Sequence, residues 1–541
     1  MVVPELGPWR AAGPHLVRIA DAVRPRLARA AGIVRRPLAR VAAAVGPRFA
    51  RPDRPGSPRV PRVARPKTWQ FTATAATAGL ALAAGVVTAA GPWDSTGQRT
   101  AERDRAAALE AVRGTDHGRG RAHAGTPPRG PGAAPPAASV LAGLGGTATA
   151  VRPAPGGEAL AGALGPLLRT PALGRHSAAV VDVATGKRLY GTGSGDAFTP
   201  ASTTKIATGV AALSAMGPDH RLTTRAVFEP DTEEVVLVGG GDPTLTAREE
   251  AGDLASLRDL AERTAAALAR RGVREVTLSY DTTLYRGAAV HPIGVNPNLA
   301  VITPLMADEG RTDDSTSGPA PRVADPAADA ARKFGGFLED HGIRATPPGR
   351  SKATTRARTL ATVSSPPLAA LVERMLTGSD NDLAEALARH TALATGENAD
   401  FAGAGAAVTA QLKRLGLPVR GAVFKDGSGL DRGGRLTADL LTALLVKAGD
   451  PARPELRPVL TGLPVAGFTG TLAGRYADGA AGVVRAKTGT LTGVNTLAGT
   501  VVDRDGRLLA FAFLANGTTD PAAAQSALDE AATALAACGC R

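Results

Sequence analysis

The chain has 541 residues, which is too long for one hydrophobic core and long enough for two or three domains. Aromatic residues make up only 3% of it, so a core must be built mainly from Ala, Val and Leu. Of the 63 basic and 49 acidic residues, 15 and 3 lie in residues 1–67, which leaves a nearly balanced 48 and 46 for the rest. This balance excludes a globular part that binds nucleic acid through a basic surface, so we expect no nucleic-acid partner.

The N-terminal part is predicted to lie outside the catalytic body. Residues 1–67 contain repeated Arg-Pro steps and are expected to form a disordered basic leader. Residues 68–93 carry no charge, have Trp69 and Trp93 near their ends and are long enough for one membrane span. Because the Arg-rich side is N-terminal, the leader is expected in the cytoplasm and the rest outside, as in a single-pass protein of the cell membrane. A cleaved signal, giving a secreted protein, is the alternative. Residues 94–160 have the Pro/Gly/Ala-rich composition of a linker.

Strand and helix patterns begin at about residue 160 and continue to the C-terminus. Strands are predicted over residues 177–183 and 188–190, in EEVVLVGG and REVTLSY of the middle region, and in VVRAKTGTL, NTLAGTVV and RLLAFAFLAN near the end. Helical patterns cover residues 202–216 and 371–394, and Asp520 with Pro521 begins a final helix. Strands at both ends with helices between them predict one α/β domain whose sheet joins N- and C-terminal strands.

The first chemical motif is STTK at residues 202–205, which follows Pro200. The proline favours a helix start here, so Ser202 and Lys205 lie on one face within side-chain reach. A serine hydroxyl needs a base to become a nucleophile, and a lysine serves as that base when burial or a nearby cation lowers its pKa. Ser-x-x-Lys is common by itself, and alone it indicates only a helix start.

The second motif is SDN at residues 379–381, directly before a helical segment. The hydroxyl of Ser379 could relay a proton and the amide of Asn381 could orient a substrate carbonyl. Since Ser, Asp and Asn are all preferred before helices, an ordinary helix cap is the simpler interpretation of this motif alone.

The third motif is KTGT at residues 487–490, inside a predicted strand. We expect Gly489 to leave the strand surface open for a substrate backbone. Lys487 would add a cation next to Lys205, and the hydroxyls of Thr488 and Thr490 could hold a carboxylate. Taken alone, the motif is equally typical of a strand with a solvated lysine.

The three motifs in this order are characteristic of class A β-lactamases and penicillin-binding proteins. With TPASTTKIAT, GGGDPTL, DGSGLDR and the C-terminal RAKTGTLTGVNTLAGTVV, the chain resembles the D-alanyl-D-alanine carboxypeptidase/endopeptidase family, peptidase family S13, the class C low-molecular-mass penicillin-binding proteins. The resemblance covers about residues 160–535. It implies a β-lactamase/transpeptidase-like domain, an antiparallel five-stranded sheet flanked by helices, formed by residues 161–224 and 361–541, with an inserted β-rich region at 225–360.

The resemblance also implies roles for the motif residues. Ser202 would attack the carbonyl between two D-amino acids while Lys205 accepts its proton, and Ser379 would pass a proton to the leaving amine with help from Lys487. The backbone N–H groups of Ser202 and Thr490 would bind the oxyanion.

On the substrate side, the resemblance implies that Asn381 holds the acyl-side amide and that Thr488 and Thr490 hold the terminal carboxylate beside Gly489. Peptidoglycan stem peptides would be the substrates and β-lactams the inhibitors. No metal or organic cofactor is expected. GGGDPTL and DGSGLDR are interpreted as turns that support the site, without a chemical role.

Two other functions stay open. A β-lactamase of the same fold needs a deacylating glutamate, and none of the acidic residues between Asn381 and Asp426 has that setting. A non-catalytic cell-wall scaffold would keep the fold without acylation. Cys538 and Cys540 are separated by one residue, which is unfavourable for an unstrained disulfide, and we expect no catalytic role for them.

Overall fold

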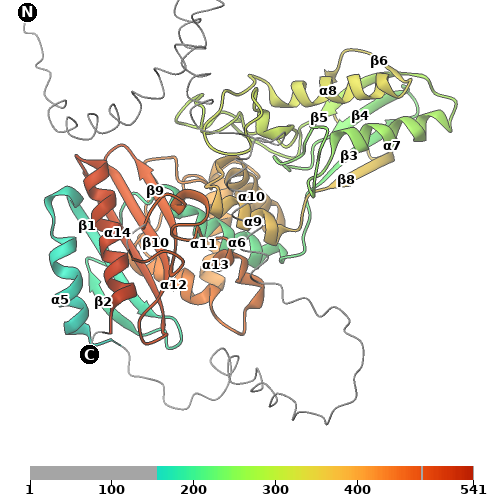
Figure 1. The fold of residues 1–541 in the computed structure, drawn as a ribbon. Helices are drawn as coiled ribbons and strands as arrows, with labels where there is room; N and C mark the ends of the chain where they lie inside the picture. The colour runs from blue at the N-terminus through green and yellow to red at the C-terminus, as the bar shows by residue number, and fades with distance from the viewer. Residues whose placement is uncertain (1–154, 477–478, 540–541) are drawn as a thin grey trace, which may run out of the picture. The chain divides into compact units, whose positions relative to one another are not determined.

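A five-stranded antiparallel sheet joins the two ends of the folded body, as the sequence predicts. The structure, a computed structural model, describes residues 155–476 and 479–539. The strand order is β2-β1-β11-β10-β9, and Figure 1 labels β1, β2, β9 and β10 of this sheet. The bounds are Arg175–Asp182 for β1, Arg188–Thr192 for β2, Val484–Leu491 for β9, Val494–Val502 for β10 and Leu508–Asn516 for β11.

Both faces of this sheet are buried because helices cover each of them. Helices α5 (Gly157–Leu168) and α14 (Pro521–Ala537) pack on one face, and α6 (Thr204–Met216) and α12 (Ala438–Ala448) pack on the other. Successive side chains of β11 point to opposite faces of the sheet and belong to different cores. Phe511 belongs to the core under α14, whereas the neighbouring Ala510 belongs to the core under α6. Small residues on the second face let the helical layer approach the sheet closely.

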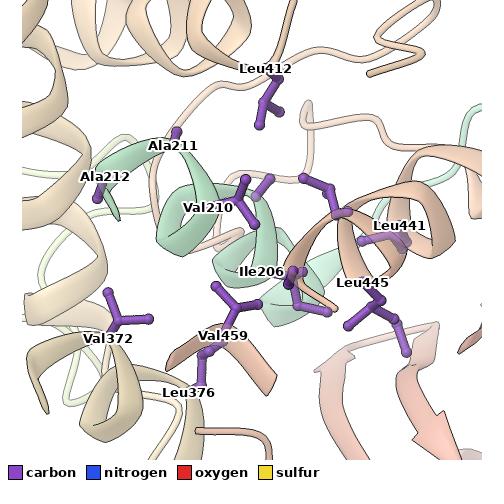
Figure 2. Close-up of a cluster of buried hydrophobic side chains, with 14 of the residues drawn as sticks. Ile206, Val210, Ala211, Ala212, Val372, Leu376, Leu412, Leu441, Leu445 and Val459 are labelled. Atoms are coloured by element: carbon purple, nitrogen blue, oxygen red, sulfur yellow. The ribbon is translucent and has the colours of Figure 1, made fainter. Parts of the chain in front are cut away.

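Helix α6, which follows the 3-10 turn η3 (Ala201–Thr203), is the centre of the helical layer. Every residue from Thr204 to Leu213 is buried. Figure 2 shows its Ile206 and Val210 among side chains from the surrounding helices. Those helices are α9 (Leu368–Thr377), α10 (Asn381–Thr395), α11 (Phe401–Arg414), α12 and the short α13 (Pro458–Thr461). The predicted helical stretch 371–394 is therefore two helices, which are separated at Gly378–Asp380.

A second sheet lies between α6 and α9 in the sequence, in what we call the inserted region, residues 223–364. Its order is β6-β5-β4-β3-β8, and β7 pairs with β5. The strands are β3 (Thr223–Glu229), β4 (Glu234–Val238), β5 (Glu275–Asp281), β6 (Arg344–Ala345), β7 (Gly349–Arg350) and β8 (Arg358–Ser364). Helices α7 (Leu257–Ala269) and α8 (Pro326–Asp340) share a separate core with it. The region that we expected to be β-rich at 225–360 is thus a mixed α/β unit, and its outer strands extend past both boundaries.

The remaining short 3-10 turns are η2 (Pro171–Leu173), η4 (Asp308–Gly310), η5 (Pro454–Leu456) and η6 (Gly470–Leu472). At the C-terminal end, Asp520 caps α14 by accepting hydrogen bonds from the N–H groups of Ala522 and Ala523, as predicted. Cys538 is disulfide-bonded.

The predicted leader 1–67 and span 68–93 lie outside the described residues. Among the residues that are described, the helices are too short or too polar to cross a membrane. Helix α5 begins at Gly157, inside the segment 94–160 that the sequence predicts to be linker.

Candidate functional site

Ser202 and Lys205 meet at the start of the central helix. Ser202 lies in the 3-10 turn η3, and Lys205 lies in the first turn of α6. Lys205 Nζ is 3.1 Å from Ser202 Oγ. The serine is partly exposed while the lysine side chain is completely buried, so a reagent from solvent can reach the hydroxyl but not the amine. The geometry is that of a nucleophile with its base.

Two further acceptors surround the Lys205 amine. Nζ donates to Asn381 Oδ1 at 2.7 Å and to the carbonyl oxygen of Ser428 at 2.8 Å. Burial lowers the pKa of Lys205 to about 8, against the opposing effect of the carboxylates of Asp426 and Glu385. Roughly a tenth of the amine is therefore unprotonated at pH 7, which is enough to act as a base.

The SDN motif occupies the break between α9 and α10. Ser379 has a positive φ of 56°, which turns the chain sharply between the two helices. Asp380 is the N-cap of α10, with its side chain accepting a hydrogen bond from Leu383 N at 2.9 Å. Asn381, the first residue of α10, points its amide oxygen at Lys205 and donates from Nδ2 to the carbonyl oxygen of Asn298 at 2.8 Å. The motif is thus both a helix cap and part of the site.

Lys487 lies on β9 and is also completely buried. Its Nζ donates to the carbonyl oxygen of Thr488 at 2.9 Å. Burial, helped by the positive charge of Lys205, holds the pKa of Lys487 well below its usual value. The interpretation of Lys487 as a solvated strand lysine is therefore excluded.

The other residues of the third motif differ in their surroundings. Thr488 Oγ1 donates to Thr471 Oγ1 at 2.9 Å, and Thr490 is exposed. A Cβ atom on Gly489 would lie 2.8 Å from the carbonyl oxygen of Pro200. The structure thus gives a reason for this glycine that the sequence did not suggest, since it accommodates the chain that leads into Ser202.

A cavity of about 300 Å³ opens over these residues. Four of the predicted site residues line it, whereas Lys205, Lys487, Thr488 and Gly489 do not. The lining consists of Ser202, Ser379, Asn381 and Thr490 together with Asn298, Arg311, Arg374, Asp380, Leu430, Thr471 and residues 316–319 of the inserted region, among others. The cavity therefore combines the transpeptidase-like domain with the inserted region.

The loop 426–431, which the sequence interpretation took as a supporting turn, also contributes a hydrogen-bond acceptor to the site. Its Ser428 carbonyl oxygen contacts Lys205, and its Gly427 carbonyl oxygen accepts a hydrogen bond from Thr208 Oγ1 at 2.7 Å. Gly429 has a φ of 84°, and a Cβ atom there would overlap the Ala201 carbonyl oxygen. The expectation that DGSGLDR has no chemical role overlooks a backbone carbonyl, for which a sequence carries no side-chain signal.

Two groups within the described residues each bring together three side chains that could ligate a metal: His291, Glu385 and Asp426, and Glu309, Asp380 and Asp382. In the first group, Glu385 accepts from Arg389 and from the loop backbone. In the second, Glu309 pairs with Arg311 and Arg374. Their oxygens are already used by protein donors, and neither group is assigned a metal.

Known proteins match this chain over the described body. A sequence profile of the D-Ala-D-Ala carboxypeptidase 3 (S13) family matches residues 160–318 and 311–537. The carboxypeptidase DacB of Mycolicibacterium smegmatis is 38% identical over 407 residues, which is 72% of this chain and 86% of that protein.

Solved structures show the same fold. Penicillin-binding protein 4 (dacB) of Haemophilus influenzae superposes with a TM-score of 0.55 at 20% identity, covering 67% of this chain and 94% of that one. The same protein in complex with a β-lactam gives a TM-score of 0.51 at 22% identity, over 66% and 93% of the two chains. The β-lactamase/transpeptidase-like fold predicted from the motifs is confirmed.

Proposed function

Because the chain belongs to the D-Ala-D-Ala carboxypeptidase 3 (S13) family, we propose that it is a serine-type D-alanyl-D-alanine carboxypeptidase/endopeptidase acting on peptidoglycan stem peptides. The observation that carries the proposal is the 3.1 Å contact between Ser202 Oγ and the buried Nζ of Lys205. β-Lactams would acylate the same serine and block it.

Acylation begins when unprotonated Lys205 accepts the proton of Ser202 as Oγ attacks the carbonyl of the penultimate D-alanine. The oxyanion of the tetrahedral intermediate is held by the backbone N–H groups of Ser202 and Thr490. The C–N bond then breaks, and the leaving amine takes a proton through Ser379, which lines the same cavity. Water hydrolyses the acyl-enzyme and restores Ser202.

Substrate recognition follows from the groups around the cavity. The Asn381 amide oxygen accepts from Lys205, and one of its Nδ2 hydrogens is donated to the Asn298 carbonyl oxygen. The second Nδ2 hydrogen is left to bind the acyl-side amide of the substrate. The exposed hydroxyl of Thr490 and that of Thr488 would hold the terminal carboxylate. The reaction requires no metal or cofactor.

Peptidoglycan lies outside the cytoplasmic membrane, so the catalytic body would act there. Residues 68–93 would act as the membrane anchor, with residues 1–67 in the cytoplasm and residues 94–156, up to the start of α5, reaching toward the wall. Secretion after signal cleavage would give the same catalytic body without the anchor.

A β-lactamase of this fold would need a carboxylate that activates the deacylating water. Glu385 is fully buried and bonded to Arg389 and to the N–H groups of Gly427 and Ser428, so it has no access to such a water. Asp382 is paired with Arg322 at 3.1 Å. These contacts favour a long-lived penicilloyl enzyme over rapid β-lactam turnover.

The test is release of D-alanine from a stem pentapeptide by the full-length protein, with Ser202→Ala as the control. We expect release by the wild type and none by the variant. Equal release by both would contradict the proposal. Penicillin turnover faster than peptide cleavage would identify a β-lactamase, and no acylation with either compound would identify a scaffold. A cross-linked peptide dimer in a parallel assay separates endopeptidase from carboxypeptidase activity.

A further inference from the structure

One segment of the inserted region, residues 291–298, contacts Asn381, which bonds to Lys205, and Asp426, which lies in the same loop as the Ser428 carbonyl oxygen that bonds to Lys205. It lies in the sequence between β5 and α8. Its first residue, His291, is 3% exposed and bonds to Asp426 of the loop 426–431. Its last residue, Asn298, bonds through its backbone to Asn381. The segment therefore joins the inserted region to the catalytic motifs at two points.

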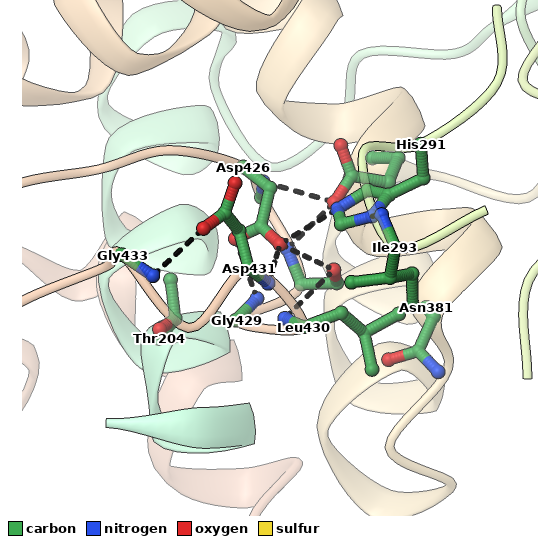
Figure 3. Close-up of polar contacts among 12 residues, drawn as sticks. Thr204, His291, Ile293, Asn381, Asp426, Gly429, Leu430, Asp431 and Gly433 are labelled. Carbon is green, nitrogen blue, oxygen red and sulfur yellow. Dashed lines mark hydrogen bonds and ion pairs between the residues drawn. The ribbon is translucent and has the colours of Figure 1, made fainter. Parts of the chain in front are cut away.

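The hydrogen bonds of His291 define which ring nitrogen donates. Nδ1 accepts a hydrogen bond from Ile293 N at 3.2 Å, so the proton is on Nε2, which donates to Asp426 Oδ2 at 2.9 Å (Figure 3). The ring also packs edge-on against Phe401 at 5.3 Å between centroids. His291 is thus held rigidly as a donor to one carboxylate.

Asp426 in turn organises the loop. Besides His291, it accepts hydrogen bonds from Gly429 N at 2.8 Å and from Asp431 N at 2.7 Å. Burial disfavours its charge, but the hydrogen bonds, led by that of His291, keep the pKa of Asp426 below its usual value. The chain folded around this carboxylate presents the Ser428 carbonyl oxygen to Lys205 Nζ.

At the other end of the segment, the Asn298 carbonyl oxygen accepts from Asn381 Nδ2. Because an amide has its donor and acceptor on opposite branches, this bond turns Asn381 Oδ1 toward Lys205 Nζ. Of the three acceptors around Nζ, Ser202 Oγ is the nucleophile, the Asn381 amide is held directly by Asn298, and the Ser428 carbonyl oxygen is linked to His291 through Asp426.

We propose that residues 291–298 are a positioning element for Lys205, with His291 as a positioning residue that acts through Asp426 and the Ser428 carbonyl. The proposal rests on the proposed function, in which Lys205 is the base. His291 itself does not contact the substrate.

The charges around the base define the expected effect. The carboxylates of Asp426, Glu385, Asp380 and Asp382 favour its protonated form, and the neighbouring amine is that of the buried Lys487, whose pKa lies well below its usual value. The charged groups facing His291 are Asp426 and Glu385, with Arg389 bonded to Glu385. Without the His291 donor, the loop relaxes and the Ser428 carbonyl oxygen leaves Nζ. The ammonium form loses an acceptor, so the pKa of Lys205 falls, and Nζ is aimed less accurately at Ser202.

The experiment measures the acylation rate of the full-length protein with a chromogenic cephalosporin between pH 6 and 10. For His291→Leu we expect the plateau, which is the acylation rate reached at high pH, to be lower by about 10- to 100-fold. We also expect the midpoint, which is the pH at which the rate is half of that plateau, to be lower than in the wild type. His291→Gln keeps a donor near the Nε2 position, and we expect it to restore both values. His390→Leu is the matched control, because His390 is a buried histidine of α10 in edge contact with Tyr285 of the inserted region. Its midpoint should equal that of the wild type.

A wild-type midpoint and plateau in His291→Leu would overturn the proposal. A lower plateau without a midpoint shift would show general damage to the fold and would overturn it as well. If His291→Leu does not fold, His291→Phe provides the test, because it keeps an aromatic ring against Phe401 and removes only the donor to Asp426, and its midpoint must lie below that of the wild type. A wild-type protein that is never acylated would instead refute the proposed function.

Discussion

Gly489 on β9 packs directly against the carbonyl oxygen of Pro200, two residues before the nucleophile. A Cβ atom on Gly489 would approach that oxygen to 2.8 Å and Thr496 Oγ1 to 2.2 Å. Thr496 Oγ1 in turn donates to the Pro200 carbonyl oxygen at 2.9 Å. The C-terminal strands thus position the turn that carries Ser202.

The change Gly489→Ala should displace this turn. Because backbone and a buried hydroxyl cannot move aside as a flexible side chain would, we expect penicillin acylation to fall by roughly 100-fold. The measurement is the second-order acylation rate. Gly336→Ala, on α8 where nothing lies within 4 Å of the added Cβ, is the control and should leave the rate unchanged. A normal rate in Gly489→Ala would contradict the role given to this glycine.

The acylation rate should rise with pH around a midpoint near 8. The reason is that the pKa of Lys205 is lowered to about 8 by burial, and only its unprotonated form accepts the serine proton. Stopped-flow acylation by a β-lactam that does not titrate in this range gives the profile. A rate that is constant from pH 6 to 9 would exclude Lys205 as the base.

Glu309 should make the folded state less stable as the pH rises. Burial, reinforced by the charge of Asp380, raises the pKa of Glu309 to about 8 from its usual 4.5. Between these values the native state holds a proton that the unfolded state releases. The contribution of Glu309 to stability is therefore fully present below pH 4.5 and is lost up to pH 8, by at most about 1.4 kcal/mol per pH unit for one proton.

Denaturant unfolding at pH 5 and pH 8 measures this effect. The free energy of unfolding should depend less on pH in Glu309→Gln than in the wild type. Glu249→Gln changes an exposed residue and should keep the wild-type dependence. An identical pH dependence in Glu309→Gln and the wild type would refute this assignment.

A substitution in the core under α6 should lower the free energy of unfolding without changing the pH dependence of acylation. Leu445 of α12 is fully buried in the cluster that Figure 2 shows. Leu445→Ala should lower the free energy of unfolding by about 2–5 kcal/mol through lost burial and a cavity. The acylation midpoint of the folded fraction should stay near pH 8, because no contact to Lys205 changes. A shifted midpoint would show that the core sets the Lys205 pKa directly.

The elements that sequence alone predicts are those with local signals. The antiparallel strands β9 to β11 and the Asp520 cap follow from neighbouring residues. The nucleophile and base are equally local, since Ser202 and Lys205 are one helical turn apart. Ser379 and Lys487 could be assigned to the same site only because the three motifs occur together in this order.

The contributions that sequence could not predict are long-range or carried by backbone atoms. His291 and Asp426 are 135 positions apart, and only the fold of the inserted region brings them together. The Ser428 and Asn298 contacts use carbonyl oxygens, which every residue type has. The close contact at Gly489 likewise depends on a segment from the other end of the domain.

The central claim is that Ser202 is acylated with Lys205 as its base. Full-length protein incubated with a labelled penicillin, digested and mapped by mass spectrometry tests it most directly. We predict one label, on Ser202, which is absent in Ser202→Ala and in a folded Lys205→Ala variant. Label on another residue, no label on the wild type, or normal labelling of Lys205→Ala would contradict the account.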